Sequence, residues 1–176
     1  MNTNDFSTAI SVNENPRQVF DAINNVRGWW SEEINGVTLH EGDVFDYHFE
    51  DIHRCKIQII ESIPGQIVAW RVLENYFKPG IFGEFEHSNV SASGFDQIEW
   101  VGTVMVFAIE EKAGKTTLTF THEGLTSEYE CFEVCATGWR HYINNSLYHL
   151  IVSGKGLPNT TGRPMTSSEK KFAAES

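Results

Sequence analysis

The sequence predicts an α+β domain in which a curved antiparallel sheet packs against one long C-terminal helix. Three observations indicate this class. A strand-like stretch at residues 6–13 is followed by two short helical stretches, most of residues 38–124 alternates between apolar and polar side chains, and residues 129–156 have helical spacing. Because the strands and helices are grouped along the chain rather than alternating, an α/β fold is not expected.

The opening stretch alternates in the manner of a strand, with Phe6, Thr8, Ile10 and Val12 on one face. A helix is then expected from Pro16, because Asn15 can cap it and proline is favoured at the first helical position. Its apolar stripe consists of Val19, Phe20 and Ile23. The stretch "RGWWSEEING" predicts a second short helix before a glycine turn.

Three strands are expected in "DVFDYHF", "RCKIQII" and "IVAWRVL", and Pro64-Gly65 should join the last two as a hairpin. A longer hairpin is expected around residues 97–125, with Ala113-Gly114 at its tip. The faces expected to look inward carry Phe45, Tyr47 and Phe49 in the first strand, and Leu118, Phe120 and His122 in the last. Trp70 and Trp100 are also placed on strands.

The long helix is expected to be the wall that closes a cavity against the sheet. Its apolar residues recur every three or four positions, and Gly154 or Gly156 should end it. Residues 74–96 are expected to form an irregular, mobile loop between the hairpins. We expect one domain over residues 1–156, and the polar residues 157–176 should form a tail with little packing of its own.

Composition excludes several classes of function. The formal net charge is −11, and no run of Lys or Arg is present. Nucleic acids and anionic membrane surfaces are therefore not expected as partners. No apolar run is long enough to span a membrane and the N-terminus lacks a secretion signal, so a soluble, cytoplasmic protein is expected. Three cysteines without a secretion signal fit reduced thiols.

Four stretches together resemble the START-like (SRPBCC) superfamily, in particular the branch of activator homologues of the heat-shock chaperone ATPase. They are "ISVNENPRQVFDAI", "VRGWWS", "EWVGTVMVFAIEEKAGKTTLTFTHEGL" and the pattern "GW…SL..LI..GKG" from Gly138 to Gly156. The resemblance implies the helix-grip fold and a cavity for small apolar molecules such as lipids, hormones or polyketides. Activity differs widely among proteins with one fold, so the resemblance implies no particular reaction.

The candidate ligand-binding residues are the aromatic and apolar side chains expected to face the cavity, and Trp139 is the first of them. The full set is Phe45, Tyr47, Phe49, Ile57, Trp70, Trp100, Phe120, His122, Trp139 and Ile143. His122 is interpreted either as a core histidine bonded to a neighbour or as a polar anchor for a ligand. No metal site is expected, because Cys131 and Cys135 lack the spacing of a metal motif, and no cofactor fingerprint is present.

Three functions therefore stay open. The first is the binding of a small hydrophobic or amphipathic molecule. The second is acid–base catalysis in the same cavity by His122, with Tyr47 as an assisting group. The third is interaction with a protein partner or with a second copy of the chain, which predicts a large exposed apolar patch.

Overall fold

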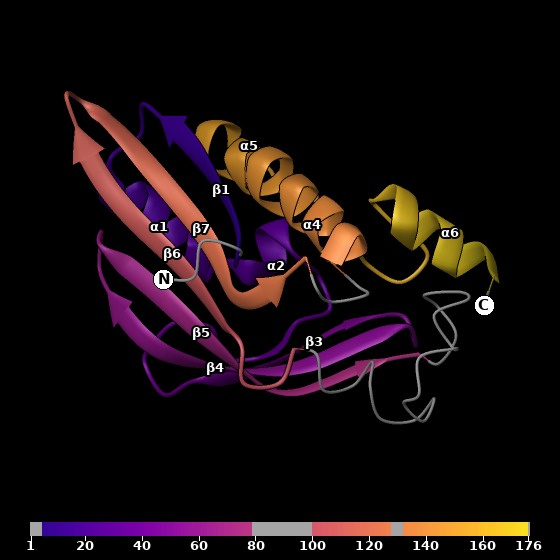
Figure 1. Cartoon of the computed structure of the whole chain (residues 1–176). Helices are drawn as coiled ribbons and strands as arrows, with labels where there is room; N and C mark the ends of the chain where they lie inside the picture. Colours follow the sequence, from indigo (N-terminus) through magenta and orange to yellow (C-terminus); the bar gives the residue numbers. More distant parts are fainter. Residues whose placement is uncertain (1–4, 79–99, 128–131, 176) are drawn as a thin grey trace.

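The structure is a computed structural model, and it describes residues 5–78, 100–127 and 132–175. One strand, two short helices, a series of strands, a long helical segment and a final helix follow one another along the chain (Figure 1). This order confirms the α+β class. No helix in the described parts of the chain has the length and apolar character needed to cross a membrane.

The sheet has seven strands in the order β1-β7-β6-β5-β4-β3-β2, and every neighbouring pair is antiparallel. The strands are β1 (Asp5–Val12), β2 (Asn35–Gly36), β3 (Val44–Phe49), β4 (His53–Ile63), β5 (Ile67–Phe77), β6 (Val104–Lys112) and β7 (Lys115–Thr126). Both predicted hairpins are present, since β4 turns into β5 through Pro64-Gly65 and β6 into β7 through Ala113-Gly114.

The sheet bends because β4 and β5 pair with two register shifts, near Ile57 and near Ile59. Figure 1 shows these strands running on past β6 and away from it, so that the far end of the sheet curves below the helices. β5 continues to Phe77 because Tyr76 and Phe77 still pair with Arg54 and His53 of β4. The prediction that the loop begins at residue 74 is therefore wrong, and its residues 79–96 lie outside the described residues.

The two short helices follow β1 as expected. Helix α1 (Pro16–Asn24) starts with a capping box in which the Asn15 side chain accepts from the Gln18 backbone N–H and the Gln18 side chain accepts from Asn15 N. Helix α2 (Val26–Trp29) follows directly. The stripe of Val19, Phe20 and Ile23 is buried.

The long helical segment runs from Phe132 to Ser153 across one face of the sheet (Figure 1). It is not one regular α-helix, because a π-helix, η2 (Arg140–Leu147), separates α4 (Phe132–Trp139) from α5 (Tyr148–Ser153). Apolar residues that recur every three or four positions fit an α-helix and a π-helix alike, so the change between the two could not be predicted from the sequence. Gly154 ends the segment with a left-handed backbone at φ 81°.

Residues after 156 pack on the rest of the chain, so the prediction of a tail with little packing is wrong. Asn159 is fully buried, and its backbone pairs with Trp30 and Glu32. Helix α6 (Ser167–Glu175) then lies beside α4, with Phe172 buried (Figure 1). The polar composition was misleading because polar side chains of this segment bond to the domain, for example Thr161 to Glu33.

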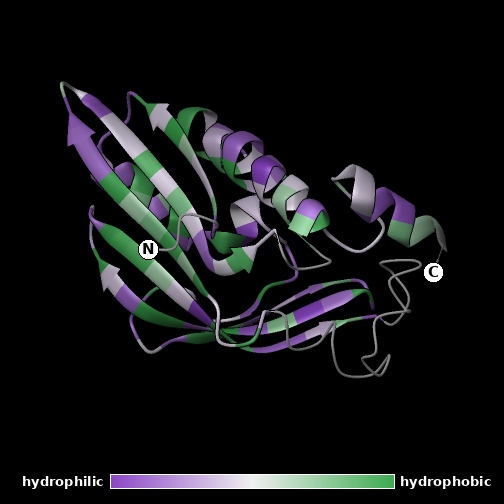
Figure 2. Cartoon of the chain, viewed as in Figure 1, coloured by the Kyte–Doolittle hydropathy of each residue, from purple (hydrophilic) through white to green (hydrophobic). Residues whose placement is uncertain are grey.

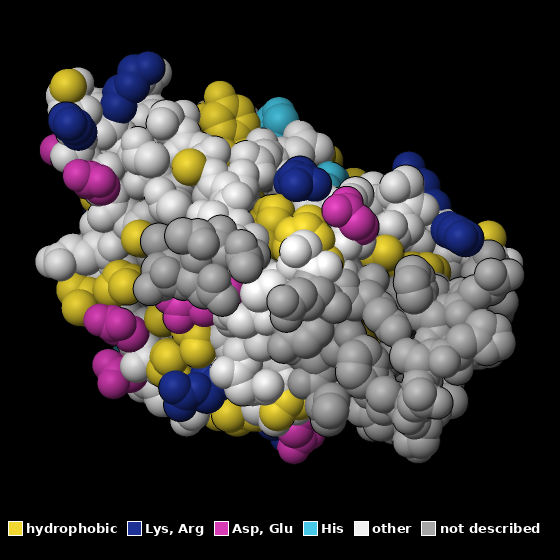
Figure 3. Space-filling model, in the orientation of Figure 1, with side chains coloured by type: hydrophobic (Ala, Val, Ile, Leu, Met, Phe, Trp, Pro, Cys, Tyr) yellow, Lys and Arg dark blue, Asp and Glu magenta, His cyan; other side chains and the backbone are white. Residues whose placement is uncertain are grey.

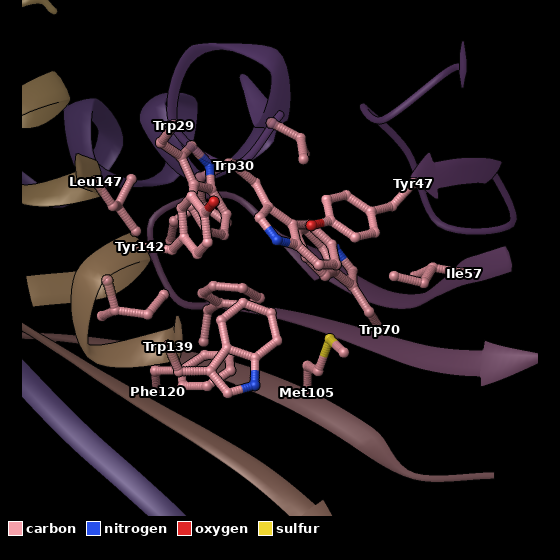
Figure 4. Close-up of a cluster of buried hydrophobic side chains, with 14 of the residues drawn as sticks. Trp29, Trp30, Tyr47, Ile57, Trp70, Met105, Phe120, Trp139, Tyr142 and Leu147 are labelled. Carbon is pink, nitrogen blue, oxygen red and sulfur yellow. Dashed lines mark hydrogen bonds between the residues drawn. The ribbon is translucent and has the colours of Figure 1, made fainter. Parts of the chain in front are cut away.

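Aromatic side chains fill most of the space between sheet and helix. The rings of Trp29, Trp30 and Trp70 lie nearly parallel to one another, with centroids 6.2 Å apart for Trp29 and Trp30, 6.1 Å for Trp29 and Trp70, and 6.0 Å for Trp30 and Trp70. Phe107 and Phe120 from the neighbouring strands continue this core toward Trp139. Figure 4 shows these rings between the helical segment and the strands, and Figure 2 shows the alternation of hydropathy along the strands that directs one face inward.

Candidate ligand-binding site

A cavity of about 70 Å³ lies at the end of the interior nearest α6. A buried water needs at least about 10–15 Å³ of such space, so the cavity has room for about five waters or for one group the size of a benzene ring. Nine of its sixteen lining residues carry aromatic rings. The lining consists of Trp30, Tyr47, Phe49, Ile52, His53, Phe77, Trp100, Val134, Cys135, Gly138, Trp139, Tyr142, Thr166, Ser168, Glu169 and Phe172.

Four of the ten predicted site residues lie in this wall: Tyr47, Phe49, Trp100 and Trp139. Tyr47 and Phe49 reach it because β3 alternates buried and less buried residues. Trp139 reaches it from the end of α4. Trp100 is not on a strand as predicted, because the chain turns there before β6 and the Thr103 N–H bonds back to the Trp100 carbonyl at 3.0 Å.

The other six predicted residues are buried in the filled part of the interior and do not line the cavity. They are Phe45, Ile57, Trp70, Phe120, His122 and Ile143. The rings of Trp29 and Trp30 pack on Trp70 and fill space in which a ligand was expected. The alternation of the strands correctly predicted which residues face inward, but not where packed side chains end and open space begins.

His122 is held by its neighbours at both ring nitrogens. Nδ1 accepts a hydrogen bond from the indole Nε1 of Trp139 at 3.1 Å, and Nε2 donates to Thr103 Oγ1 at 2.8 Å. The Thr103 hydroxyl hydrogen is used in turn, because it is donated to the Trp100 carbonyl at 2.6 Å. Burial lowers the pKa of His122 to about 3. This arrangement matches the interpretation of His122 as a satisfied core histidine.

A polar cluster forms the side of the cavity next to α6. The Tyr142 hydroxyl donates to Glu169 Oε2 at 2.6 Å, and Asn159 Nδ2 donates to the hydroxyls of Tyr142 and Tyr47 at 2.7 and 3.1 Å. Glu169 also accepts from the Thr166 backbone N–H, while its own N–H bonds to the Thr166 hydroxyl. The carboxylate therefore caps α6 and holds this helix to the π-helix.

Burial keeps three titratable groups of the wall uncharged: Tyr47, Tyr142 and His53. Desolvation is the main cause that raises the pKa of Tyr47 and of Tyr142, and the nearby Glu169 carboxylate raises both further. His53 stacks on Phe77 at 4.2 Å and donates from Nε2 to Asn75 Oδ1 at 2.8 Å. Burial lowers the His53 pKa to about 4 despite this bond, so the ring is neutral at pH 7.

Two polar atoms at this end are buried without a hydrogen-bond partner: Trp100 Nε1 and Asn159 Oδ1. A second buried indole N–H, that of Trp70, is unpaired in the filled core. Because a buried donor without a partner costs about 1–3 kcal/mol, such atoms are uncommon in native proteins. Trp100 lines the cavity, and an acceptor atom there could satisfy its indole N–H.

Sequence reasoning missed the lining residues that come from outside the expected inward faces. The sequence places Trp30 on a short helix near the cavity entrance but not among the predicted site residues, and that set also lacks His53, Phe77, Tyr142 and the α6 residues. A signal for α6 was present, because "TSSE" at 166–169 is a capping box followed by apolar Phe172 and Ala173. Tyr142 precedes the predicted Ile143 and becomes buried beside it in the π-helix.

The described cysteines and several residues of the "GW…SL..LI..GKG" pattern lie in buried, hydrogen-bonded or closely packed positions. Cys55 and Cys135 are buried free thiols, Cys131 lies outside the described residues, and no three potential ligands cluster among the residues that the structure describes. Ser146 Oγ donates to the Trp29 carbonyl and accepts from Leu157 N, both at 2.7 Å. Gly156 packs so closely on the Gly28 carbonyl that a Cβ would clash, which explains the glycine.

Comparisons with known proteins support the fold. No protein-family model matches the chain, and no curated protein matches it in sequence. The solution structure of the Aha1 dimer from Colwellia psychrerythraea is 20% identical, covers 86% of this chain and 98% of its own, and has a TM-score of 0.64. Protein SSP2350 from Staphylococcus saprophyticus is 16% identical, with 89% and 98% covered and a TM-score of 0.58.

A third similar structure is DynU16, from the dynemicin biosynthetic locus. It is 16% identical and has a TM-score of 0.58, with 88% of this chain and 49% of DynU16 covered. At these identities the likeness concerns the fold alone. The comparisons therefore show an α+β fold that this chain shares with these three proteins.

Proposed function

We propose that the protein binds a small, largely apolar molecule, or the apolar end of a larger one, in the cavity between β3, β4, α4 and α6. The observation that carries this proposal is an aromatic wall around open space beside a buried indole N–H without an acceptor. Ligand sites in proteins are commonly concave, mostly apolar and supplied with a few polar groups. A neutral acceptor on the ligand would pair with Trp100 Nε1.

The proposed site residues are revised accordingly. Tyr47, Phe49, Trp100 and Trp139 are kept from the sequence prediction, and Trp30, His53, Tyr142 and Phe172 are added. The likeness to the Aha1 structure, the highest of the three TM-scores reported above, supports a relation to the chaperone ATPase activator homologues as a proposal about ancestry. Catalysis by His122 is not favoured by its geometry, because neither ring nitrogen is available to a substrate.

Gly138 offers a direct test because it lines the cavity and a Cβ added to it meets no atom within 4 Å. Gly138→Leu should therefore place its side chain in the cavity and leave the surrounding packing intact. Gly138→Ala is the matched control, since one methyl group leaves most of the space open. The readout is binding of tert-butylbenzene, measured by tryptophan fluorescence and by the shift in melting temperature.

We expect tert-butylbenzene to bind the wild type and Gly138→Ala, and to bind Gly138→Leu at least tenfold more weakly. Equal binding to both variants would place the probe elsewhere and contradict the proposal. Native mass spectrometry of the protein purified from its own host would then identify a co-purifying molecule by its released mass.

A further inference from the structure

The charges around the cavity are of one sign. Glu169 is the one carboxylate among the described lining residues, and none of those residues is a Lys or Arg. His53, the only lining histidine among them, is neutral at pH 7 because burial lowers its pKa to about 4. An anionic ligand such as a fatty acid would thus lack a counterion in this wall, and burying an unpaired charge is costly.

The Glu169 carboxylate acts on the interior of the cavity. Its Oε2 atom is 2.6 Å from the Tyr142 hydroxyl, and its charge helps to raise the pKa of Tyr47 on β3. Three hydrogen bonds from Tyr142, Met165 N and Thr166 N fix the carboxylate in place. A fixed negative charge on one side of a partly open cavity favours a cation inside it.

The aromatic rings of the wall supply a second attraction for a cation. Indole and phenol rings attract ammonium groups within about 6 Å of the ring centroid, and the attraction grows when the ion is desolvated. Trp30, Trp100 and Trp139 all stand in the wall, at 5.1 and 5.9 Å between the ring centroids of neighbours. The net charge of −11 adds a long-range attraction for cations.

We propose that the cavity is selective for an organic cation: an ammonium group, or the ammonium end of a larger apolar molecule, held between the aromatic wall and Glu169. This inference rests on the proposed function, since it names the class of ligand for the same site. Space for about five waters accommodates one trimethylammonium or phenyl group, and the rest of a larger ligand would extend past α6. Apolar side chains gather where α4 faces α6 (Figure 3).

The test uses three probes of nearly equal shape: phenyltrimethylammonium, neutral tert-butylbenzene and anionic benzenesulfonate. Each is titrated into the full chain by isothermal calorimetry at low ionic strength, where attraction between charges is least screened. We expect the cation to bind at least tenfold more tightly than the neutral probe and the anion to show no binding. Equal affinity of the cation and the neutral probe would overturn the inference.

Glu169→Gln is the decisive variant because the glutamine oxygen can keep the capping box, while its amide NH2 faces the Tyr142 hydroxyl and can donate to that oxygen. Glu110→Gln is the control, since it removes the same charge from an exposed position on β6. Glu169→Gln should reduce the ratio of cation affinity to tert-butylbenzene affinity by at least fivefold, whereas Glu110→Gln should leave this ratio unchanged. An unchanged advantage in Glu169→Gln would contradict the role of this carboxylate.

The outcomes separate this inference from the function on which it rests. Binding of tert-butylbenzene without preference for the cation would leave a neutral apolar site and remove the cation selectivity. Both proposals would be overturned if none of the three probes bound the wild type and if the probes left the melting temperatures of the wild type and Gly138→Leu equally unchanged.

Discussion

The two ends of the space between sheet and helix have similar aromatic composition but different packing. The rings of Trp29, Trp70 and Phe107 are in contact with one another, and none of the three residues lines the cavity. Around Trp100, His53 and Phe172 comparable rings surround open space. The difference comes from the elements that supply the rings. The filled end is built from central strands and α2, whereas the open end is completed by α6, which follows α5 after the connecting residues 154–166.

The comparison teaches that aromatic residues become core or cavity wall according to what closes the layer above them. At the filled end, Trp29 Nε1 donates to the Ile23 carbonyl at 3.0 Å and the ring is fully buried. At the open end, the closing element is attached by a few polar bonds, among them Tyr142 to Glu169. The predictions below test this difference, from the largest expected effect to the smallest.

Removing a ring from the filled end should cost the most. Trp29→Ala leaves a large cavity among Trp30, Trp70 and Phe107 and an unpaired Ile23 carbonyl, so we expect a loss of about 3–5 kcal/mol in the free energy of unfolding. Urea unfolding followed by circular dichroism measures it. Phe172→Ala in α6 is the comparison variant and should cost less, and equal losses would show that both ends contribute alike to global stability.

Acidification should weaken both ends through two buried histidines. Burial lowers the pKa of His122 to about 3 and that of His53 to about 4, both below the ordinary 6.5. The unfolded chain therefore binds more protons below pH 6.5, and the free energy of unfolding should fall as the pH falls. Each histidine contributes up to about 1.4 kcal/mol per pH unit, until its folded-state pKa is reached.

The two histidines can be separated by substitution. His53→Gln at the open end and His122→Gln at the filled end should each remove about half of the histidine-dependent slope between pH 6 and 5, measured by urea unfolding at each pH. A slope unchanged by both substitutions would show that other groups determine the acid sensitivity.

Loosening α6 should have a moderate, local effect. Tyr142→Phe removes the bond to Glu169 and leaves one Asn159 N–H without its acceptor, so we expect a loss of about 1–2 kcal/mol. Hydrogen exchange should become faster in residues 165–175 and stay unchanged in β6 and β7. Equal acceleration in the strands would mean that α6 does not open independently of the sheet.

The smallest change is expected at the helix wall of the cavity. Gly138→Ala replaces a helical glycine where a Cβ meets open space, and we expect about 0.5–1 kcal/mol of added stability from the reduced entropy of the unfolded chain. Thermal unfolding checks it. A loss of stability would indicate that the cavity around Gly138 is narrower than the structure shows.

Much of the sheet and helix order could be predicted from the sequence because strand alternation and the Asn15 capping box are local signals. The cavity wall could be predicted only in part. Alternation indicates that Tyr47 and Phe49 face inward, but the stacking of Trp29 on Trp70 depends on residues 41 positions apart in the chain. The packing of residues 157–175 was missed because hydrogen bonds such as Thr161 to Glu33 leave no trace in hydropathy.

The ends of the sheet set a limit on self-association. At the β1 edge the Asn144 side chain from the π-helix accepts from the Thr8 hydroxyl and donates to the Ala9 carbonyl, a backbone acceptor that an added strand would need. At the other edge β2 is only two residues long. Blunted edges of this kind protect a sheet from edge-to-edge polymerisation. A second copy of the chain is therefore not expected to join by extending the sheet, and amyloid-like growth from the folded state is disfavoured at both edges.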